Sequence, residues 1–589
     1  MRLKSLKIKN FRAINGEENI IQFGDNNIVF IFGKNNIGKS SILHAYQYFA
    51  SPTQSASATD FYNHNTKTPI IIEAIYTKEL IDDKNFDDKG LNKWVDAHGD
   101  VKLRKTWATE NGTAKKETFD PTKGEFADGG FGGLDQILTN ATPNIIYIEA
   151  MPSAKSLTDW LEKEIKSKLL KKLKENHTDE YEKALKSVRD LQEKVEGEDY
   201  LGKIREGANK YFAKTFPELE LKIQSTPNKE ADLSKAFEKD FSITIGKKGE
   251  IQTVEAEERL AEAVETLEAL SQTDDSQRSV DRQFDLHGHG LIRQAIINIL
   301  GIFKETKENQ KHIILFEEPE LYLHPSNKRK FRDTLYDIAD QPNYQMICVS
   351  HDPQLIDLSR PHTSLARFVR MSNGETAIYQ AGDNVFCKDA ETKDRVQMLN
   401  RFNPHICETF FADEVILVEG DTEAIVLREL LAIHYKDSEV FVLNTGSKNN
   451  IPFFIQTLSH FKIGQHVIHD SDERHLYAKG AAQLNKDGEK TKNSAWTLNQ
   501  SIWNEIQASI AKRCFAIRYV CIRNFENAHS YKHDKQKGKP LSAHEFAKGI
   551  DIADNAIPIV KFLNQIVGTL PRDVEFTPDY LEKTVSEPY

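Results

Sequence analysis

A glycine-rich loop near the N-terminus constrains the fold of this chain more than any other feature. It reads Gly33-Lys34-Asn35-Asn36-Ile37-Gly38-Lys39-Ser40 and matches the pattern G-x-x-x-x-G-K-S/T. Its glycines let successive backbone N–H groups point at phosphate oxygens, while the lysine neutralises charge and the serine hydroxyl reaches Mg²⁺. A continuous apolar run, 28–32, precedes the loop, and a helical pattern opens at Ser41. We therefore predict a nucleotide site in an α/β domain, with these contacts: Gly33, Asn35, Asn36, Gly38, Lys39, Ser40 and Ser41.

Length and composition limit what else the chain can be. Its 589 residues correspond to two to four domains of about 150 residues each. With 39% hydrophobic residues the chain can fill large cores, so it is not disordered as a whole. Its 78 Lys and Arg against 89 Asp and Glu give a net charge of −11. This balance argues against a general nucleic-acid coat but leaves room for a local basic channel.

The sequence also favours a cytoplasmic location. No stretch approaches about 18 uncharged apolar residues, so we expect no membrane-spanning helix and no membrane partner. The first twelve residues are highly charged and lack an apolar segment, so we expect no secretory signal. The five cysteines form no C-x-x-C pair, which is typical of free thiols in a reducing compartment.

Two further strand ends complete the predicted nucleotide site. An apolar strand at 313–316 leads to Glu317, which would help to hold Mg²⁺ through water, and to Glu318, which would polarise the attacking water. A second strand, 347–349, leads to His351, which can reach the γ-phosphate. Paired glutamates also occur in solvated turns, and a single histidine is often structural. The order of the three elements favours the nucleotide interpretation.

A stretch from about 155 to 213 has a different pattern, in which apolar residues recur at helical spacing among Lys and Glu. One stripe is Leu161, Ile165, Leu169 and Leu173, and the other is Leu185, Val188, Leu191 and Val195. This pattern predicts two amphipathic helices in an antiparallel hairpin. The stripes could pack only against each other, or also against a second copy of the chain.

A second group of acidic residues lies in the C-terminal third. A buried strand at 416–418 ends in Glu419, and Glu423 follows one helical turn later. A further strand, 466–469, ends in Asp470 and Asp472. Two strand ends that bring four carboxylates together make a hard-oxygen site suited to Mg²⁺ or Mn²⁺. Glu423 could instead be an acid that stabilises a helix N-terminus.

The glycine loop, the Glu-Glu strand and the histidine resemble the ATP-binding-cassette (ABC) ATPase heads of the SMC/RecF/OLD superfamily. Asn10-Phe11-Arg12 matches an N-terminal element of that superfamily, which implies that Arg12 lies near the nucleotide. The candidate signature loop is Gly288-His289-Gly290, whose N–H groups would contact the γ-phosphate held by a second head. Glu317 in place of the usual Asp and His289 inside the signature are departures that suggest slow turnover.

The second acidic group resembles a TOPRIM domain, with Glu419 and the Asp470/Asp472 pair in the places of its Glu and Asp-x-Asp elements. A TOPRIM domain after a RecF-like head is the OLD (overcoming lysogenization defect) architecture. The resemblance implies two metals, with Glu526 as a further ligand, and a late catalytic lysine at Lys548, with Lys561 as the rival.

The implied fold class is α/β: an ABC-type P-loop ATPase domain with a helical dimerisation insertion, then a Rossmann-like TOPRIM domain. The implied boundaries are 1–154 and 214–400 for the ATPase domain, 155–213 for the insertion and 401–589 for the TOPRIM domain. We expect at least a homodimer held by the insertion, or a tetramer formed by two such dimers.

The resemblance implies an ATP-binding, Mg²⁺- or Mn²⁺-dependent DNA endonuclease in anti-phage defence, acting alone or with a helicase-like or retron partner. Two lysine clusters could contact DNA or be solvated loops: Lys479, Lys486, Lys490 and Lys492, and Lys532, Lys535, Lys537 and Lys539. The main alternative is an SMC-like ATP-driven DNA clamp whose TOPRIM domain binds nucleic acid without cutting it. A TOPRIM primase lacks support, because no zinc-binding cysteine cluster is present.

Overall fold

The computed structural model describes residues 1–24, 27–35, 37–79, 82, 86–87, 90–128, 142–150, 311–357, 365–380, 404–572 and 575–585, with short pieces within 178–187 and at 244–245 and 282–283. The chain divides into two compact units, Met1–Ala150 with Leu300–Tyr589, and Met151–Ile299. Most of the predicted insertion, and the signature loop at Gly288–Gly290, lie outside the described residues, so the domain boundaries stay predictions. None of the helices in the described ranges is both long and apolar enough to cross a membrane.

The predicted strand before the glycine loop is central in a six-stranded sheet of the first unit. The sheet has the order β14 (Thr376–Gln380), β13 (Leu365–Arg370), β3 (Ile28–Phe32), β12 (Tyr344–Val349), β11 (His312–Glu317) and β8 (Asn144–Ile148). All neighbours are parallel except β13 and β14. This fully buried β3 confirms the expectation of a strand covered on both faces.

Helices cover both faces of this sheet. The buried side of α1 (Ser40–Ala50) shares one apolar core with Val29 and Ile31 of β3. On the other face the ring of Phe30 lies 5.5 Å from that of Tyr336, which is in α10 (Pro325–Ala339). Successive side chains of β3 therefore pack against helices on opposite faces of the sheet, which holds the strand in place. Because the glycine loop begins directly after β3, it lies at the carboxyl edge of the sheet.

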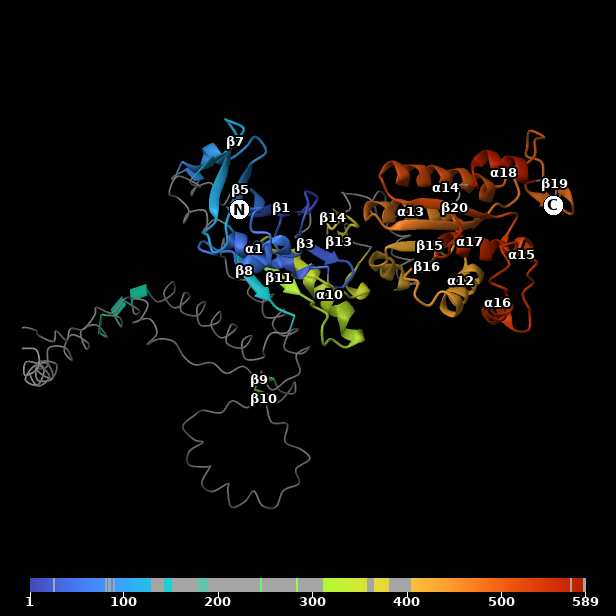
Figure 1. Ribbon diagram of the computed structural model, residues 1–589, viewed down its shortest axis with the longest axis horizontal. Coiled ribbons are helices and arrows are strands. Elements are labelled where there is room, and N and C mark those ends of the chain that lie inside the picture. The colour runs from blue at the N-terminus through green and yellow to red at the C-terminus, as the bar shows by residue number, and fades with distance from the viewer. Residues whose placement is uncertain are drawn as a thin grey trace, which may run out of the picture. The chain divides into compact units, whose positions relative to one another are not determined.

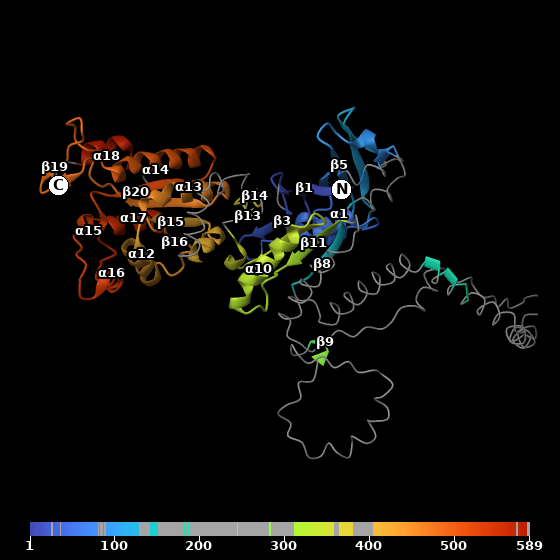
Figure 2. The same cartoon turned by 180° about the vertical axis from the view of Figure 1, so that it is seen from behind.

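A second, antiparallel sheet packs against α1 (Figures 1 and 2). Its order is β2 (Ile20–Gln22), β1 (Arg2–Lys9), β4 (Ile70–Thr77), β5 (Asp100–Trp107), β6 (Lys115–Asp120) and β7 (Glu125–Asp128). Buried side chains alternate with partly buried ones along β4, which is the pattern of a strand packed on one face. The last three strands lie in a polar stretch whose sequence shows no clear alternation of apolar and polar residues. Most side chains of β5, for example, are only partly buried.

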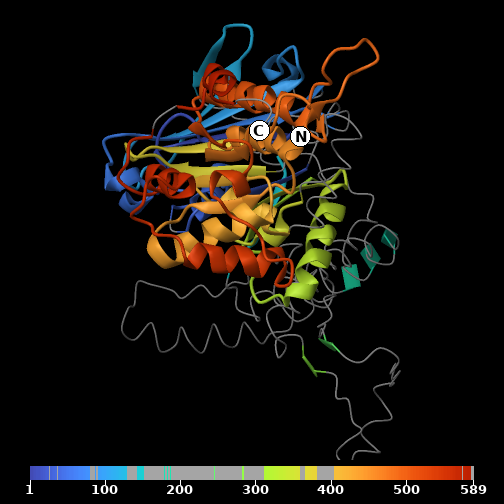
Figure 3. The same cartoon turned by 90° about the vertical axis from the view of Figure 1, so that its right-hand side faces the viewer.

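The C-terminal part contains a four-stranded, fully parallel sheet of order β16 (Phe441–Asn444), β15 (Glu414–Val418), β17 (Gly464–Asp470) and β20 (Ala516–Cys521). One face shares a core with α12 (Asp421–His434), α16 (Gly538–Lys548) and α17 (Pro558–Ile566). The other packs against α13 (Ile451–His460) and α14 (Ser494–Ala511), so orange and red helices lie above and below the strands in Figure 3. The strand order changes direction beside β15, and ligands of such sheets bind at the carboxyl ends next to that point.

The two sheets with parallel strands are joined by a buried arginine. Arg367 of β13 donates hydrogen bonds to the backbone oxygens of Phe461 and Ala412 at 3.0 and 2.8 Å, and pairs with Asp413 at 2.7 Å. Burial lowers the pKa of Arg367, and the charge of Asp413 opposes this change. A charge buried in this way is stable only while all these partners are in place.

Candidate functional site

The glycine loop has the backbone geometry of a phosphate cradle. Gly38 has φ +97°, and a Cβ at this position would collide with the Cβ of Ala13. At Gly33, with φ +146°, a Cβ would collide with the carbonyl oxygen of Phe368. The ammonium of Lys39 is buried and donates to the carbonyl oxygens of Gly33 and Lys34 at 2.9 and 2.6 Å. The loop is therefore closed around its lysine, as the motif predicts.

Ser40 and Glu317 meet beside this lysine, as expected for two groups that share a Mg²⁺ ion. The Ser40 hydroxyl donates to Glu317 Oε1, and the Tyr147 hydroxyl donates to the other oxygen at 3.4 Å. Burial lowers the pKa of Lys39 to about 8, while Glu318 and Glu320 oppose the change. Phosphate oxygens beside Lys39 would favour the charged form of its amine and so raise its pKa again. The site therefore favours an anionic ligand.

Glu318 and Glu320 have different surroundings, which separates their roles. Glu318 has φ +44°, its side chain is 33% exposed, and its Oε1 lies 3.8 Å from His351 Nε2. Glu320 is buried and accepts hydrogen bonds from the Ser350 hydroxyl and the His351 N–H at 3.0 and 2.8 Å. Glu318 can therefore face water and nucleotide, whereas Glu320 fixes the loop that carries His351.

The other predicted nucleotide contacts stay predictions. Arg12 Nε donates to Asp60 at 2.9 Å, so its role at the nucleotide stays a prediction. The N–H of Ser41 donates to Gly38 within the loop at 3.0 Å, and Asn35 lies in the same loop. Asn36 and the Gly288–Gly290 signature lie outside the described residues.

The second acidic centre forms at the carboxyl ends of β15 and β17. Glu419 follows β15 directly, and its Oε1 accepts the backbone N–H of Asp470 at 2.7 Å. Glu423 lies in the first turn of α12, and Asp472 follows β17 with φ +60°. Glu526 is the second residue of α15 (Phe525–Ala528), and its charge adds to burial in raising the pKa of Glu423. All five predicted ligands therefore gather at one edge of the sheet.

Burial and mutual repulsion destabilise the charged forms of these carboxylates. Burial raises the pKa of Glu419 to about 7, with Asp472 and Glu423 adding repulsion. The pKa of Asp470 is raised to about 9 by burial, then by Glu419, Glu423 and Asp472. Asp470 Oδ1 is buried without a hydrogen-bond partner. A cation at this point would satisfy that oxygen and remove the repulsion.

The donor set therefore fits a hard divalent cation, because every group is a carboxylate oxygen. Within the described ranges, however, no three His, Cys, Asp or Glu side chains are already grouped as a ligand set. Glu419 is turned toward the Asp470 N–H, and Asp472 pairs with Lys448 at 2.7 Å.

Lys448 is the residue of this centre that the sequence did not reveal. It follows β16 in a short turn, its side chain is 6% exposed, and its ammonium donates to Asp470 O and Asp472 Oδ2. Lys448 favours the charged form of Glu419 and so offsets part of the repulsion. A lysine followed by two asparagines after a glycine turn looks like an exposed loop, so only the structure shows that it points inward.

The catalytic lysine stays a prediction. Lys548 is exposed at the last position of α16, and its rival Lys561 pairs with Glu575 at 2.8 Å. Lys539, from the second basic cluster, acts electrostatically on Glu423. All eight lysines of the two predicted clusters are exposed, which suits either a solvated loop or a DNA contact.

Comparisons with known proteins define the class as an ATPase with a nuclease domain. The family described as AAA ATPase domain matches residues 1–356, and the overcoming lysogenization defect protein-like TOPRIM domain matches residues 410–472. These domains imply use of a nucleotide and of divalent metal in general. The chain belongs to the AAA ATPase-domain family, and residues 410–472 match the OLD-like TOPRIM domain, as the resemblance of its acidic motifs implied.

Curated relatives include nucleases. The chain is 26% identical to the Old nuclease of Escherichia phage P2 over 496 residues, which cover 80% of this chain and 77% of the relative. It is 25% identical to the OLD nuclease of Thermus scotoductus over 47% of this chain and 52% of the relative, and to Endonuclease GajA of Bacillus cereus over 28% and 26%. A solved SMC head bound to the C-winged helix domain of ScpA is similar at a TM-score of 0.35 and 14% identity, over 65% of this chain and 98% of that structure.

Glu318→Gln should bind ATP but hydrolyse it about a hundredfold more slowly, because an amide cannot polarise the attacking water. Glu320→Gln is the matched control. Its amide oxygen can still accept from Ser350 and His351, so both binding and hydrolysis should stay near the parental values. Equilibrium nucleotide binding and phosphate release measure the two effects. If Glu318→Gln hydrolysed ATP at the parental rate and Glu320→Gln lost hydrolysis, Glu320 would be the residue that polarises water.

The acidic centre should make metal-free stability depend on pH. Because the pKa of Asp470 rises to about 9 on folding, from 3.8, the unfolded chain releases this proton first, and stability falls as pH rises between these values. We expect the melting temperature in EDTA to fall between about pH 5 and pH 8, and Mg²⁺ to reverse the fall. Asp470→Asn should flatten this trend, whereas the exposed Asp437→Asn should not. Identical pH profiles for Asp470→Asn and the parent would refute the charge cluster.

Proposed function

We propose that the chain is an ATP-regulated DNA endonuclease that uses Mg²⁺ or Mn²⁺ at the TOPRIM carboxylates. The observation that carries this proposal is the partnerless, buried Oδ1 of Asp470 amid carboxylates that repel one another. A purely structural acidic turn would have no reason to bury such a group. The three curated relatives named as nucleases support the same reading.

The residues of the acidic centre divide the work. Glu419, Asp470 and Asp472 would hold the cations, with Glu423 and Glu526 completing the ligands on the α12 side. When bound, a metal pair can activate water and stabilise the departing oxygen of a phosphodiester. Lys448 holds Asp472 and the Asp470 backbone in place, which orients both aspartates toward the same edge. Lys548 is proposed to approach the departing oxygen from the end of α16.

Control by ATP is supported by a contact between the glycine loop and the TOPRIM sheet. The Lys34 ammonium lies 2.7 Å from Asp413, one residue before β15, and also pairs with Glu439, two residues before β16. Lys34 also offers its carbonyl to Lys39, which would bind phosphate. Nucleotide binding that moves this loop would therefore act on the strand that carries Glu419.

Several finer features belong to the same proposal. A cytoplasmic location is supported by the buried thiols of Cys348, Cys514 and Cys521 among the described residues. The apolar stripes of residues 155–213 support dimerisation through that stretch, or a tetramer formed by two such dimers. A role in anti-phage defence, alone or beside a helicase-like or retron partner, is supported by the names of the phage and GajA relatives.

Nicking of supercoiled plasmid tests the proposal. With Mg²⁺ or Mn²⁺, the parent should convert the plasmid, while Glu419→Gln and Asp470→Asn should be at least about a hundredfold slower through loss of metal stabilisation. Both variants should still bind ATP, and Asp437→Asn, which removes an exposed carboxylate of the same domain, should cut normally. A parent that retains plasmid on a filter but never nicks it would favour the clamp instead.

A further inference from the structure

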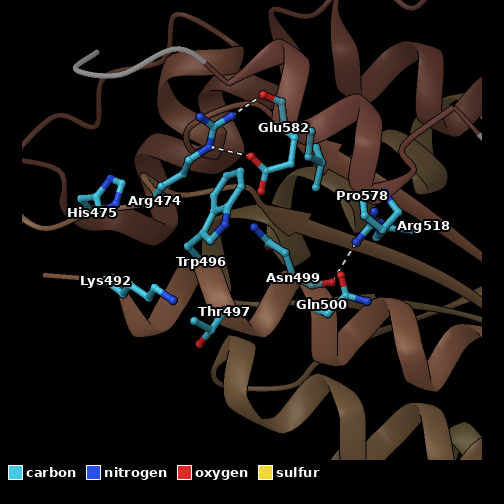
Figure 4. A pocket seen from close by; sticks show the side chains of 11 residues that line it. Arg474, His475, Lys492, Trp496, Thr497, Asn499, Gln500, Arg518, Pro578 and Glu582 are labelled. Carbon is cyan, nitrogen blue, oxygen red and sulfur yellow. Dashed lines mark hydrogen bonds and ion pairs between the residues drawn. The ribbon is translucent and has the colours of Figure 1, made fainter. Parts of the chain in front are cut away.

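A cavity of about 410 Å³ lies beside the acidic centre in the TOPRIM domain (Figure 4). Its walls come from the segment after Asp472, the first two turns of α14, strand β20 and α18 (Pro578–Thr584). A cavity of this size suits a small ligand or one unit of a polymer. No step of the proposed metal chemistry uses it.

The lining of the cavity is cationic. Arg474, Lys492 and Arg518 contribute three positive charges, and Glu582 is the one carboxylate that lines it. Arg474 is paired with Glu582 at 3.2 Å, but no acid within the described ranges lies at ion-pair distance from the exposed Lys492. In a chain with net charge −11, this local excess marks a place for an anion.

Arg518 is built into the cavity wall. It is 2% exposed, and its guanidinium donates to backbone oxygens of Phe576 and Asn499 at 2.8 and 2.9 Å rather than to a carboxylate. Burial lowers the pKa of Arg518 to about 10, so it remains charged at neutral pH. The positive potential of the wall is therefore fixed by the fold and does not depend on flexible surface side chains.

An aromatic ring lies among these charges. Trp496 is half-buried in the first turn of α14, and its indole extends into the cavity between Arg474 and Asn499 in Figure 4. The Arg474 guanidinium lies 5.2 Å from the ring centroid. An aromatic face beside an arginine and a lysine is the combination that stacks a nucleobase and holds its phosphate.

The cavity is connected to the metal ligands by short covalent and hydrogen-bonded links. Asn499, which is buried, donates to the backbone oxygen of Ser471 at 2.8 Å, and Ser471 lies between the two aspartates. Arg474 follows Asp472 by two residues, a span of at most about 7 Å. Because phosphates of one strand repeat about every 3.4 Å along the duplex axis, the cavity lies within a few nucleotides of the cleaved bond.

We propose that this cavity binds an unpaired nucleotide of the DNA substrate, with its base stacked on Trp496 and its phosphate at Lys492. The inference rests on the proposed nuclease function and specifies its substrate. A base within a duplex is stacked on both sides and cannot reach the indole, whereas a frayed, flipped or single-stranded base can. The protein should therefore prefer DNA that is locally single-stranded beside the cut.

Oligonucleotide binding to the full chain in EDTA tests the proposal without requiring cleavage. Trp496→Leu and Lys492→Gln should each weaken binding of a labelled single-stranded oligonucleotide by about tenfold, the size of one base stack, and leave a blunt duplex unaffected. Trp496→Phe, which keeps an aromatic face, should bind nearly as the parent does. Lys436→Gln, an exposed lysine of the same domain outside the cavity and outside both lysine clusters, should bind normally. Unchanged melting temperatures exclude a folding defect.

The alternatives give different results. Equal losses on single strand and duplex, or no loss in Trp496→Leu, would overturn the proposal. A free deoxynucleoside monophosphate that competes as strongly as the oligonucleotide would also overturn it, in favour of a small-nucleotide site. Trp496-dependent binding of single strands without any plasmid cutting would leave this cavity assignment intact and refute the nuclease function.

Discussion

Repulsion among buried carboxylates determines the electrostatics of the acidic centre in the C-terminal part of this protein. Parallel strands β15 and β17 end at the same edge, so Glu419 and Asp470 are brought together by the sheet itself. Both are desolvated, and the charges of Glu419, Glu423 and Asp472 raise the cost of ionising Asp470. Lys448 compensates only part of this charge, because one ammonium faces several acids. The fold therefore maintains an arrangement that becomes favourable only when cations are present.

The same strand geometry connects this centre to the nucleotide loop. Strand β3 leads into the loop and pairs with β13, whose buried Arg367 binds backbone oxygens just before β15 and β17 of the TOPRIM sheet. Lys34 of the loop pairs with Asp413 immediately before β15. Buried charges with several fixed partners tolerate little displacement, so movement at one site is resisted or transmitted at the other. These contacts are the physical basis of the proposed control of cutting by ATP.

The sequence predicted the parts of the fold that depend on continuous apolar strands and on backbone motifs. The strands at 28–32 and 414–418 were visible because both faces are buried, and the glycine loop because Gly38 cannot carry a side chain beside Ala13. Glu419, Asp470 and Asp472 were found because they lie at the ends of such strands.

Features that depend on tertiary contacts were not visible. Lys448 looks like a loop lysine until β16 brings it against Asp472, and β5 has no clear alternation because its side chains are half-exposed. The Trp496 cavity joins residues from segments more than eighty positions apart, which no local pattern can indicate. Sequence resemblance implied that Arg12 lies near the nucleotide, but it did not indicate that Asp60 would hold the Arg12 side chain.

Direct measurement of Mn²⁺ binding to the full chain, without nucleotide or DNA, tests the central claim most directly. Electron paramagnetic resonance distinguishes bound from free Mn²⁺ at equilibrium. The account predicts that the parent and Lys39→Ala bind the ion alike, because the acidic centre does not need the glycine loop, and that Asp470→Asn loses this binding. Retention of parental Mn²⁺ binding by Asp470→Asn would contradict the assignment of the metal to this centre.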